Sequence, residues 1–147
     1  MVSLPYEKSQ STHSNEALFS YCFTTRIHDI DAAGVMFFAR NLYHAHDAYE
    51  AFLSHHQQSI ADILKSDYSL PIRHTEADFT APIFLNDMLR IELFLADKQD
   101  TEFTLYYQFI NTDEVITSTD LTRHVCLNKA SWQRTQLPES ICNLLER

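Results

Sequence analysis

The sequence predicts an α+β fold in which a curved antiparallel sheet wraps around one long central helix. Apolar residues recur at steps of three and four over about 38–53, with no proline or glycine to interrupt them, which is the period of a helix with one apolar face. Most other hydrophobic segments alternate with a period of two and are joined by short polar turns, as in paired antiparallel strands. Only this helix is long enough to cover the apolar face of the sheet, so it is expected at the centre.

Each element follows from a local pattern. The first strand is expected at 18–27, where aromatic and polar side chains alternate. The long helix follows, and a shorter helix is expected at about 60–64. After Pro71 the alternating pattern returns, and the final stretch "PESICNLLER" opens with a proline, which is favoured at a helix start. The later elements are strands at about 72–80, 88–96, 102–111 and 115–128, and a short terminal helix after 138.

Length and composition indicate one globular domain. A chain of 147 residues with 45% hydrophobic residues can bury its own core, so we expect a single domain over 18–147 after a loose tail at 1–17. The net charge of −9 would repel a nucleic-acid backbone. The chain has no run of eighteen apolar residues and no signal-like start. A cytoplasmic protein without membrane insertion is therefore expected.

The cysteines and histidines give no metal or redox signature. The three cysteines lie far apart without a Cys-x-x-Cys pair. The neighbouring histidines, His44 with His46 and His55 with His56, lack the i, i+4 spacing of a helical metal site. Free thiols, no metal and no cofactor are therefore expected.

Gly34 is the only glycine in the chain, although a chain of this length has about ten on average. Glycine is needed where φ is positive or where another group approaches the bare backbone. Asp29 and Asp31 precede it, and the following helix start offers N–H groups without intrahelical acceptors. Such groups can stabilise an oxyanion beside a carboxylate that acts as nucleophile or general base. The residues alone leave open a second interpretation, in which the aspartates cap the helix or stabilise the loop.

The stretch "DIDAAGVMFFARNLYHAHDAYEAFL" resembles the N-terminal signature of hotdog-fold acyl-CoA thioesterases of the 4-hydroxybenzoyl-CoA thioesterase type. In that signature Asp-x-Asp-x-x-Gly-x-Val precedes the long central helix. A second segment, "ADFTAPIFLNDMLRIEL", is also similar, so the resemblance covers nearly the whole chain. The segments "HAHDAYEAFL", "LPIRHTEADF" and "TRHVCLN" most resemble the branch that hydrolyses 1,4-dihydroxy-2-naphthoyl-CoA in menaquinone or phylloquinone biosynthesis. The resemblance implies a hotdog fold and hydrolysis of that aromatic acyl-CoA.

The resemblance also assigns roles to residues. Asp31, the second acid of the motif, becomes the catalytic carboxylate, and Asp29 becomes a structural residue. The expected oxyanion donors are backbone N–H groups near Phe37 and Phe38, with Gly34 leaving room for the thioester. His46 and Glu50 are expected to contact the aromatic acyl group or to orient water in catalysis, and Glu50 is the alternative catalytic acid. Tyr49 is expected as a substrate contact, and Arg123 and Lys129 are expected as the cations that bind the CoA phosphates. Ordinary structural roles remain open for these five: a surface ion pair, core packing and surface cations.

Two other functions fit the same residues. One is a broad thioesterase that acts on short- or medium-chain acyl-CoA or acyl carrier protein. The other is a module that binds acyl-CoA without chemistry, which the intact Asp31 argues against. The resemblance further implies a homodimer joined through sheet edges, and a homotetramer built from two such dimers.

Overall fold

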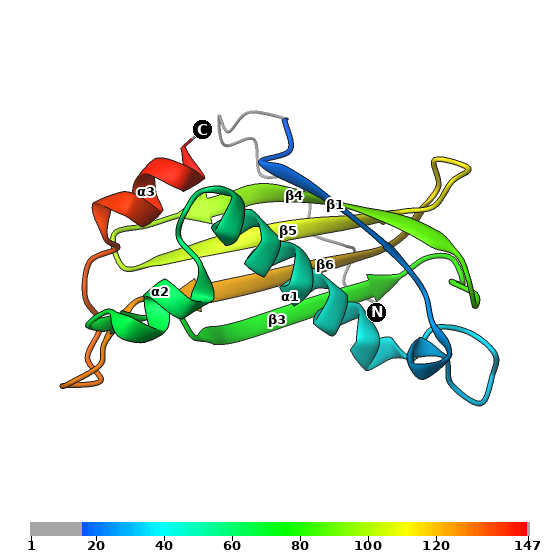
Figure 1. The fold of residues 1–147 in the computed structure, drawn as a ribbon, viewed down its shortest axis with the longest axis horizontal. Helices are drawn as coiled ribbons and strands as arrows, with labels where there is room; N and C mark the ends of the chain where they lie inside the picture. Colours follow the sequence, from blue (N-terminus) through cyan, green and yellow to red (C-terminus); the bar gives the residue numbers. More distant parts are fainter. Residues whose placement is uncertain (1–15, 147) are drawn as a thin grey trace, which may run out of the picture.

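The computed structural model describes residues 16–146 of the chain, and most of the predicted tail at 1–17 lies outside the described residues. Five strands form one curved antiparallel sheet, and helix α1 (Phe38–His55) lies across one of its faces (Figure 1). The predicted arrangement of a sheet around a central helix is therefore confirmed. The sheet has the order β1-β4-β5-β6-β3, with β1 (Phe19–Thr24), β3 (Ile72–Phe79), β4 (Met88–Lys98), β5 (Glu102–Ile110) and β6 (Ile116–Val125).

Shorter elements complete the described chain. A 3-10 helix links β1 to the loop before α1, and two short strands form a separate pair beside the main sheet. None of the described helices is long and apolar enough to cross a bilayer. The short elements are the 3-10 helix (Ile27–Asp29), α2 (Ile60–Lys65), β2 (Tyr68–Ser69), β7 (Leu127–Asn128) and α3 (Glu139–Leu145).

Two predicted strands are too long. The strand expected at 18–27 ends at Thr24, because the backbone N–H of Arg26 donates to the Asp29 carboxylate and turns the chain into the 3-10 helix. The strand expected at 115–128 leaves the main sheet after Val125, and Leu127–Asn128 pairs with β2 instead. Both errors lie at ends where a tertiary hydrogen bond or a new partner interrupts the alternating pattern.

The core lies between α1 and the inner faces of β1, β4 and β5. Alternate residues of β4 and β5, such as Leu93 and Phe109, are fully buried there. On the helix, Ala45 and Ala48 are also fully buried, and their small side chains let α1 lie close to the sheet. Burial of this apolar surface is the main favourable term in folding.

The inner face of β6 is polar, in contrast to its neighbours. Ser118, Asp120, Thr122 and His124 all point inward and are all buried. The Thr122 hydroxyl lies 3.1 Å from the Tyr107 hydroxyl and 3.0 Å from His124 Nε2. Burial raises the pKa of Asp120 to about 6, although a hydrogen bond from Asn41 opposes the shift. Burial likewise lowers the pKa of His124 to about 4.

The loop before α1 explains the single glycine. Gly34 has a φ of +82° and donates its N–H to the Asp31 carbonyl, at 3.0 Å. A Cβ added to Gly34 would meet no atom within 4 Å, so contact with another part of the described chain is not what excludes a side chain here. The positive φ is what requires glycine here. Four other described residues have a positive φ and carry side chains: Gln57, Asn86, Glu114 and Trp132.

The polar row predicts how stability responds to pH. The lowered pKa of His124 makes acidification between about pH 6.5 and 4 destabilise the fold, since the unfolded chain then binds more protons there. The raised pKa of Asp120 has the opposite effect on stability. As the pH falls, Asp120 binds its proton in the folded chain before it does so in the unfolded chain, and this stabilises the fold. We therefore expect Asp120→Asn to lose stability more steeply than wild type between about pH 7 and 4.5 in urea unfolding. Parallel pH profiles for the two proteins would contradict this assignment.

The Gly34 loop predicts a ranking of two substitutions. Gly34→Val should lower the free energy of unfolding by about 1–3 kcal/mol, because a β-branched residue is strained at positive φ. Gly34→Asn, which tolerates this conformation, should lose much less. Urea unfolding of both variants beside wild type measures the difference. A Val variant as stable as the Asn variant would show that the loop relaxes without cost.

Candidate active site

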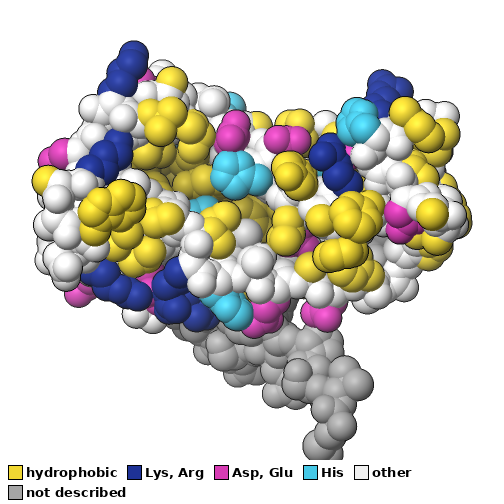
Figure 2. All heavy atoms as spheres, turned by 90° about the horizontal axis from the view of Figure 1, so that it is seen from below, with side chains coloured by type: hydrophobic (Ala, Val, Ile, Leu, Met, Phe, Trp, Pro, Cys, Tyr) yellow, Lys and Arg dark blue, Asp and Glu magenta, His cyan; other side chains and the backbone are white. Residues whose placement is uncertain are grey.

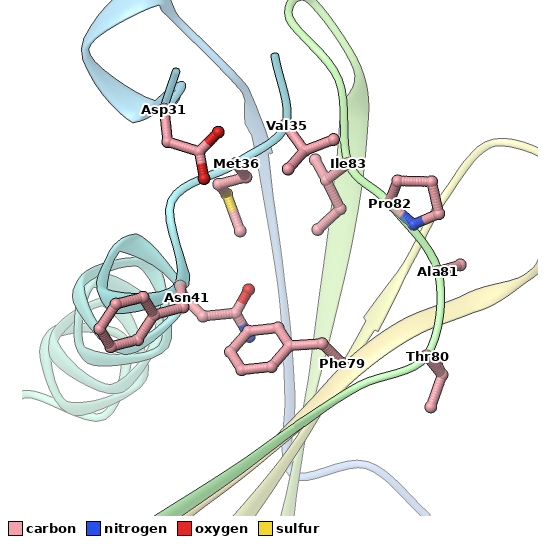
Figure 3. A pocket seen from close by; sticks show the side chains of 10 residues that line it. Asp31, Val35, Met36, Asn41, Phe79, Thr80, Ala81, Pro82 and Ile83 are labelled. Atoms are coloured by element: carbon pink, nitrogen blue, oxygen red, sulfur yellow. The ribbon is translucent and has the colours of Figure 1, made fainter. Parts of the chain in front are cut away.

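A pocket of about 430 Å³ opens between the start of α1 and the segment that follows β3. Figure 3 shows the segment Thr80–Ile83 facing Asp31 and Asn41 across this space. Most of the lining side chains are apolar, and the polar ones belong to Asp31, Asn41 and Thr80. The lining residues are Asp31, Val35, Met36, Phe38, Asn41, Phe79, Thr80, Ala81, Pro82 and Ile83.

Asp31 presents a partly free carboxylate to the pocket. Its Oδ1 accepts a hydrogen bond of 2.8 Å from the backbone N–H of Ala33, which fixes the side chain within the turn. No partner for Oδ2 is found among the described residues. In Figure 3 the carboxylate points into the pocket. The arrangement leaves one oxygen available to a reacting carbon or to a water molecule.

The start of α1 supplies backbone donors beside Asp31. The N–H groups of Met36 and Phe37 are already used, since they donate to the carbonyls of Ile83 and Asp29 at 2.7 and 2.8 Å. Within the described chain, the N–H groups of Phe38 and Ala39 have no acceptor, and no side chain caps the helix. Of the two expected oxyanion donors, Phe38 is therefore the available one. Ala39 is a donor that the sequence interpretation missed.

Asp29 holds the loop against the helix. It is buried, and its carboxylate accepts hydrogen bonds from the Arg26 backbone, Arg40 Nε and His44 Nε2 at 2.8–2.9 Å. The His44 ring is in turn stacked on Phe23 of β1, with centroids 3.9 Å apart. Burial raises the pKa of Asp29, but these hydrogen bonds outweigh it and hold the pKa below its usual value. Asp29 is thus a structural carboxylate, and neither aspartate caps α1.

Three of the expected substrate contacts lie elsewhere on α1. Tyr49 is buried against His124, with ring centroids 4.5 Å apart, and burial raises the pKa of its phenol. His46 and Glu50 form an i, i+4 pair at 3.3 Å, with side chains 44% and 49% exposed. None of the three lines the pocket that contains Asp31.

The two expected CoA-binding cations differ in availability. The Lys129 ammonium donates to the carbonyls of Ile63, Leu64 and Ser66, which uses all of its N–H groups to anchor the end of α2. Arg123 donates only through Nε, to the Thr104 hydroxyl, among the described residues. The terminal guanidinium nitrogens of Arg123 therefore have no hydrogen-bond partner among the described residues.

Asn41 and the segment Phe79–Ile83 complete the pocket but were missed in the sequence. The segment begins at the end of the strand expected at 72–80 and continues beyond it, and nothing local places it beside the helix start. Asn41 belongs to the long helix, where the apolar residues dominated the pattern. Its partners on β6 are 77 and 79 residues away. Within the described part of the chain, no group of three or more His, Cys, Asp or Glu side chains could hold a metal ion.

Comparison with known proteins supports the same assignment. The family described as "Thioesterase-like superfamily" matches residues 25–145. A 1,4-dihydroxy-2-naphthoyl-CoA hydrolase of Gloeothece citriformis is 38% identical over 86% of this chain and 91% of its own length. The corresponding hydrolase of Nostoc punctiforme is 35% identical over 87% and 86%.

Solved structures agree with this result. The crystal structure of a 1,4-dihydroxy-2-naphthoyl-CoA thioesterase from Synechocystis superposes with a TM-score of 0.82 at 28% identity, covering 86% of this chain and 94% of that one. The hotdog fold implied by the sequence resemblance is therefore confirmed. The chain belongs to the thioesterase-like superfamily and, within it, to the family of 1,4-dihydroxy-2-naphthoyl-CoA hydrolases.

Proposed function

We propose that this protein hydrolyses 1,4-dihydroxy-2-naphthoyl-CoA, with Asp31 as the catalytic carboxylate. The observation that carries the proposal is the Asp31 carboxylate facing an apolar pocket beside the unpaired N–H groups at the start of α1. Similarity to hydrolases of this substrate, which extends over most of the chain, supports the choice of acyl group.

The reaction uses the two halves of the site separately. The thioester carbonyl oxygen gains negative charge as oxygen adds to its carbon, and the N–H groups of Phe38 and Ala39 stabilise this charge together with the positive end of α1. Asp31 either adds to the carbon itself or removes a proton from the attacking water. The C–S bond then breaks, and CoA leaves as a thiolate that takes up a proton from the attacking water or from solvent. On the general-base route the acyl group leaves directly as the carboxylic acid, and on the covalent route a water molecule hydrolyses the acyl-Asp31 anhydride to give the same acid and free Asp31. Single turnover in ¹⁸O-water distinguishes the routes, since only the covalent route labels Asp31.

The remaining expected site residues lie outside the pocket that contains Asp31. Glu50 is the alternative catalytic acid, but it lies outside the pocket and is paired with His46. We assign His46 and Glu50 to substrate contacts along α1, and Tyr49 to the packing of α1 against His124 of β6. For the CoA phosphates we favour Arg123 over Lys129, because the lysine has no free donor. We expect the protein to act in the cytoplasm, because its described cysteines are free thiols and thiols stay reduced in that compartment.

A second copy of the chain is proposed to cover edge strand β3. This strand pairs only with β6 within the sheet, and nearly all of its residues are exposed. Figure 2 looks from below Figure 1, toward the side on which β3 lies, and shows hydrophobic side chains gathered in patches on this face. Ile72 and Phe79, at the two ends of β3, are 40% and 52% exposed. A long exposed edge is normally paired or covered, and pairing two β3 edges would bring both pockets to the seam.

The catalytic assignment predicts a contrast between two aspartates. Wild type should release CoA thiol from 1,4-dihydroxy-2-naphthoyl-CoA faster than from hexanoyl-CoA or benzoyl-CoA. Asp31→Asn should lower kcat by a factor of about 100 or more, a barrier change of ~2.7 kcal/mol, with little loss of stability. Asp29→Asn should instead lower the thermal midpoint, because a buried network loses its charge. Wild-type turnover in Asp31→Asn would refute the assignment, and higher rates on hexanoyl-CoA would favour a broad thioesterase.

The dimer prediction concerns mass in solution. Sedimentation at micromolar concentration should give at least twice the 17.1 kDa of one chain. A tetramer of two such dimers is our expectation at higher concentration. A fully active monomer would exclude the proposed seam.

A further inference from the structure

Asn41 is a buried polar side chain at the inner end of the pocket. It is 0% exposed and lies on α1, one turn after Phe37. Its Nδ2 donates to Ser118 Oγ at 2.8 Å and to Asp120 Oδ1 at 2.9 Å, so both amide protons are used. These bonds fix the orientation of the amide, because a flipped amide would place its oxygen against the Asp120 carboxylate.

The other end of the amide is unsatisfied. Asn41 Oδ1 is buried and has no hydrogen-bond partner among the described residues. In Figure 3 this oxygen lies on the side of the amide that faces the pocket, toward Met36 and Ile83. A buried acceptor left without a donor is destabilising, because the hydrogen bonds it made to water are not replaced. The pocket therefore contains one prepared position for a donor on its ligand.

The surroundings of Asn41 Oδ1 select the chemistry of that donor. The pocket walls beside it are Met36, Phe38 and Ile83, and an apolar wall disfavours an ammonium group, whose hydration shell would be lost against a neutral amide. A hydroxyl group on a planar ring loses less on desolvation and supplies the missing proton. Asp31 lies on the same pocket, so a ring bound with its thioester at Asp31 can reach inward to Asn41.

We propose that Asn41 Oδ1 accepts a hydrogen bond from a ring hydroxyl of the acyl group and so determines specificity for hydroxylated substrates. Asp120 acts as a positioning residue, since it receives an Nδ2 proton and keeps Oδ1 turned toward the pocket. This role of Asn41 rests on the proposed function, and no local feature of the sequence indicates it.

The test compares two substrates that differ only in hydroxyl groups, 1,4-dihydroxy-2-naphthoyl-CoA and 2-naphthoyl-CoA. The quantity measured is the ratio of their kcat/KM values in wild type, Asn41→Leu and Ser118→Ala. Leu is close to Asn in shape but cannot accept a hydrogen bond. We expect the ratio to fall about tenfold or more in Asn41→Leu. Ser118→Ala disturbs the same cluster but retains Oδ1, so its ratio should stay well above that of Asn41→Leu.

Several outcomes would overturn the inference. Equal losses on both substrates in Asn41→Leu would show a purely structural role, and an unchanged ratio would show no role in recognition. If Asn41→Leu does not fold, the Asn41 side-chain amide signals of wild type are followed by NMR. They should shift with 1,4-dihydroxy-2-naphthoate and not with 2-naphthoate, and equal shifts would overturn the proposal. A wild type that hydrolyses neither thioester would instead refute the proposed function itself.

Discussion

The active-site region depends on the buried carboxylate of Asp29. Through its two oxygens it joins the backbone before the loop, at Arg26, to the side chains of Arg40 and His44 on α1. Its own carbonyl receives the N–H of Phe37. The loop with Asp31 is therefore tied at its base to α1, whose first residue, Phe38, lines the pocket. The proposed reaction needs the Asp31 carboxylate and the oxyanion donors held within fractions of an ångström, and the hydrogen bonds to Asp29 constrain both the loop and the helix.

The hydrogen bonds to Asp29 also separate the roles of two similar residues. Asp29 and Asp31 are two positions apart, yet the Asp29 carboxylate is 1% exposed and accepts hydrogen bonds from three donors, whereas the Asp31 carboxylate faces the pocket and accepts one. A carboxylate surrounded by donors is a poor nucleophile and a poor base, because its charge is already stabilised. Asp31 keeps one carboxylate oxygen without a hydrogen-bond partner among the described residues.

The fold was largely predictable because its signals are local. The helical period of α1 and the alternation in the strands are visible within short stretches of sequence. The predicted strand boundaries are wrong at the ends of β1 and β6, where the chain makes hydrogen bonds that the alternating pattern does not reveal. The motif around Gly34 also placed Asp31 at the helix start. By contrast, Asn41 could not be recognised, since its importance comes from Ser118 and Asp120 on a strand far along the chain. The use of the Phe37 N–H by a loop carbonyl is equally invisible in sequence.

The scarcity of glycine has an energetic consequence for the rest of the molecule. Only the loop before α1 places glycine in the left-handed region, while Gln57, Glu114 and Trp132 hold their turns there with a Cβ. Each such residue carries strain of roughly 1–2 kcal/mol, although the stiffer unfolded chain recovers part of it. Three connections outside the pocket therefore carry backbone strain that a substitution by glycine or asparagine would relieve. Thermostabilisation can begin at these turns without altering the residues that surround the substrate.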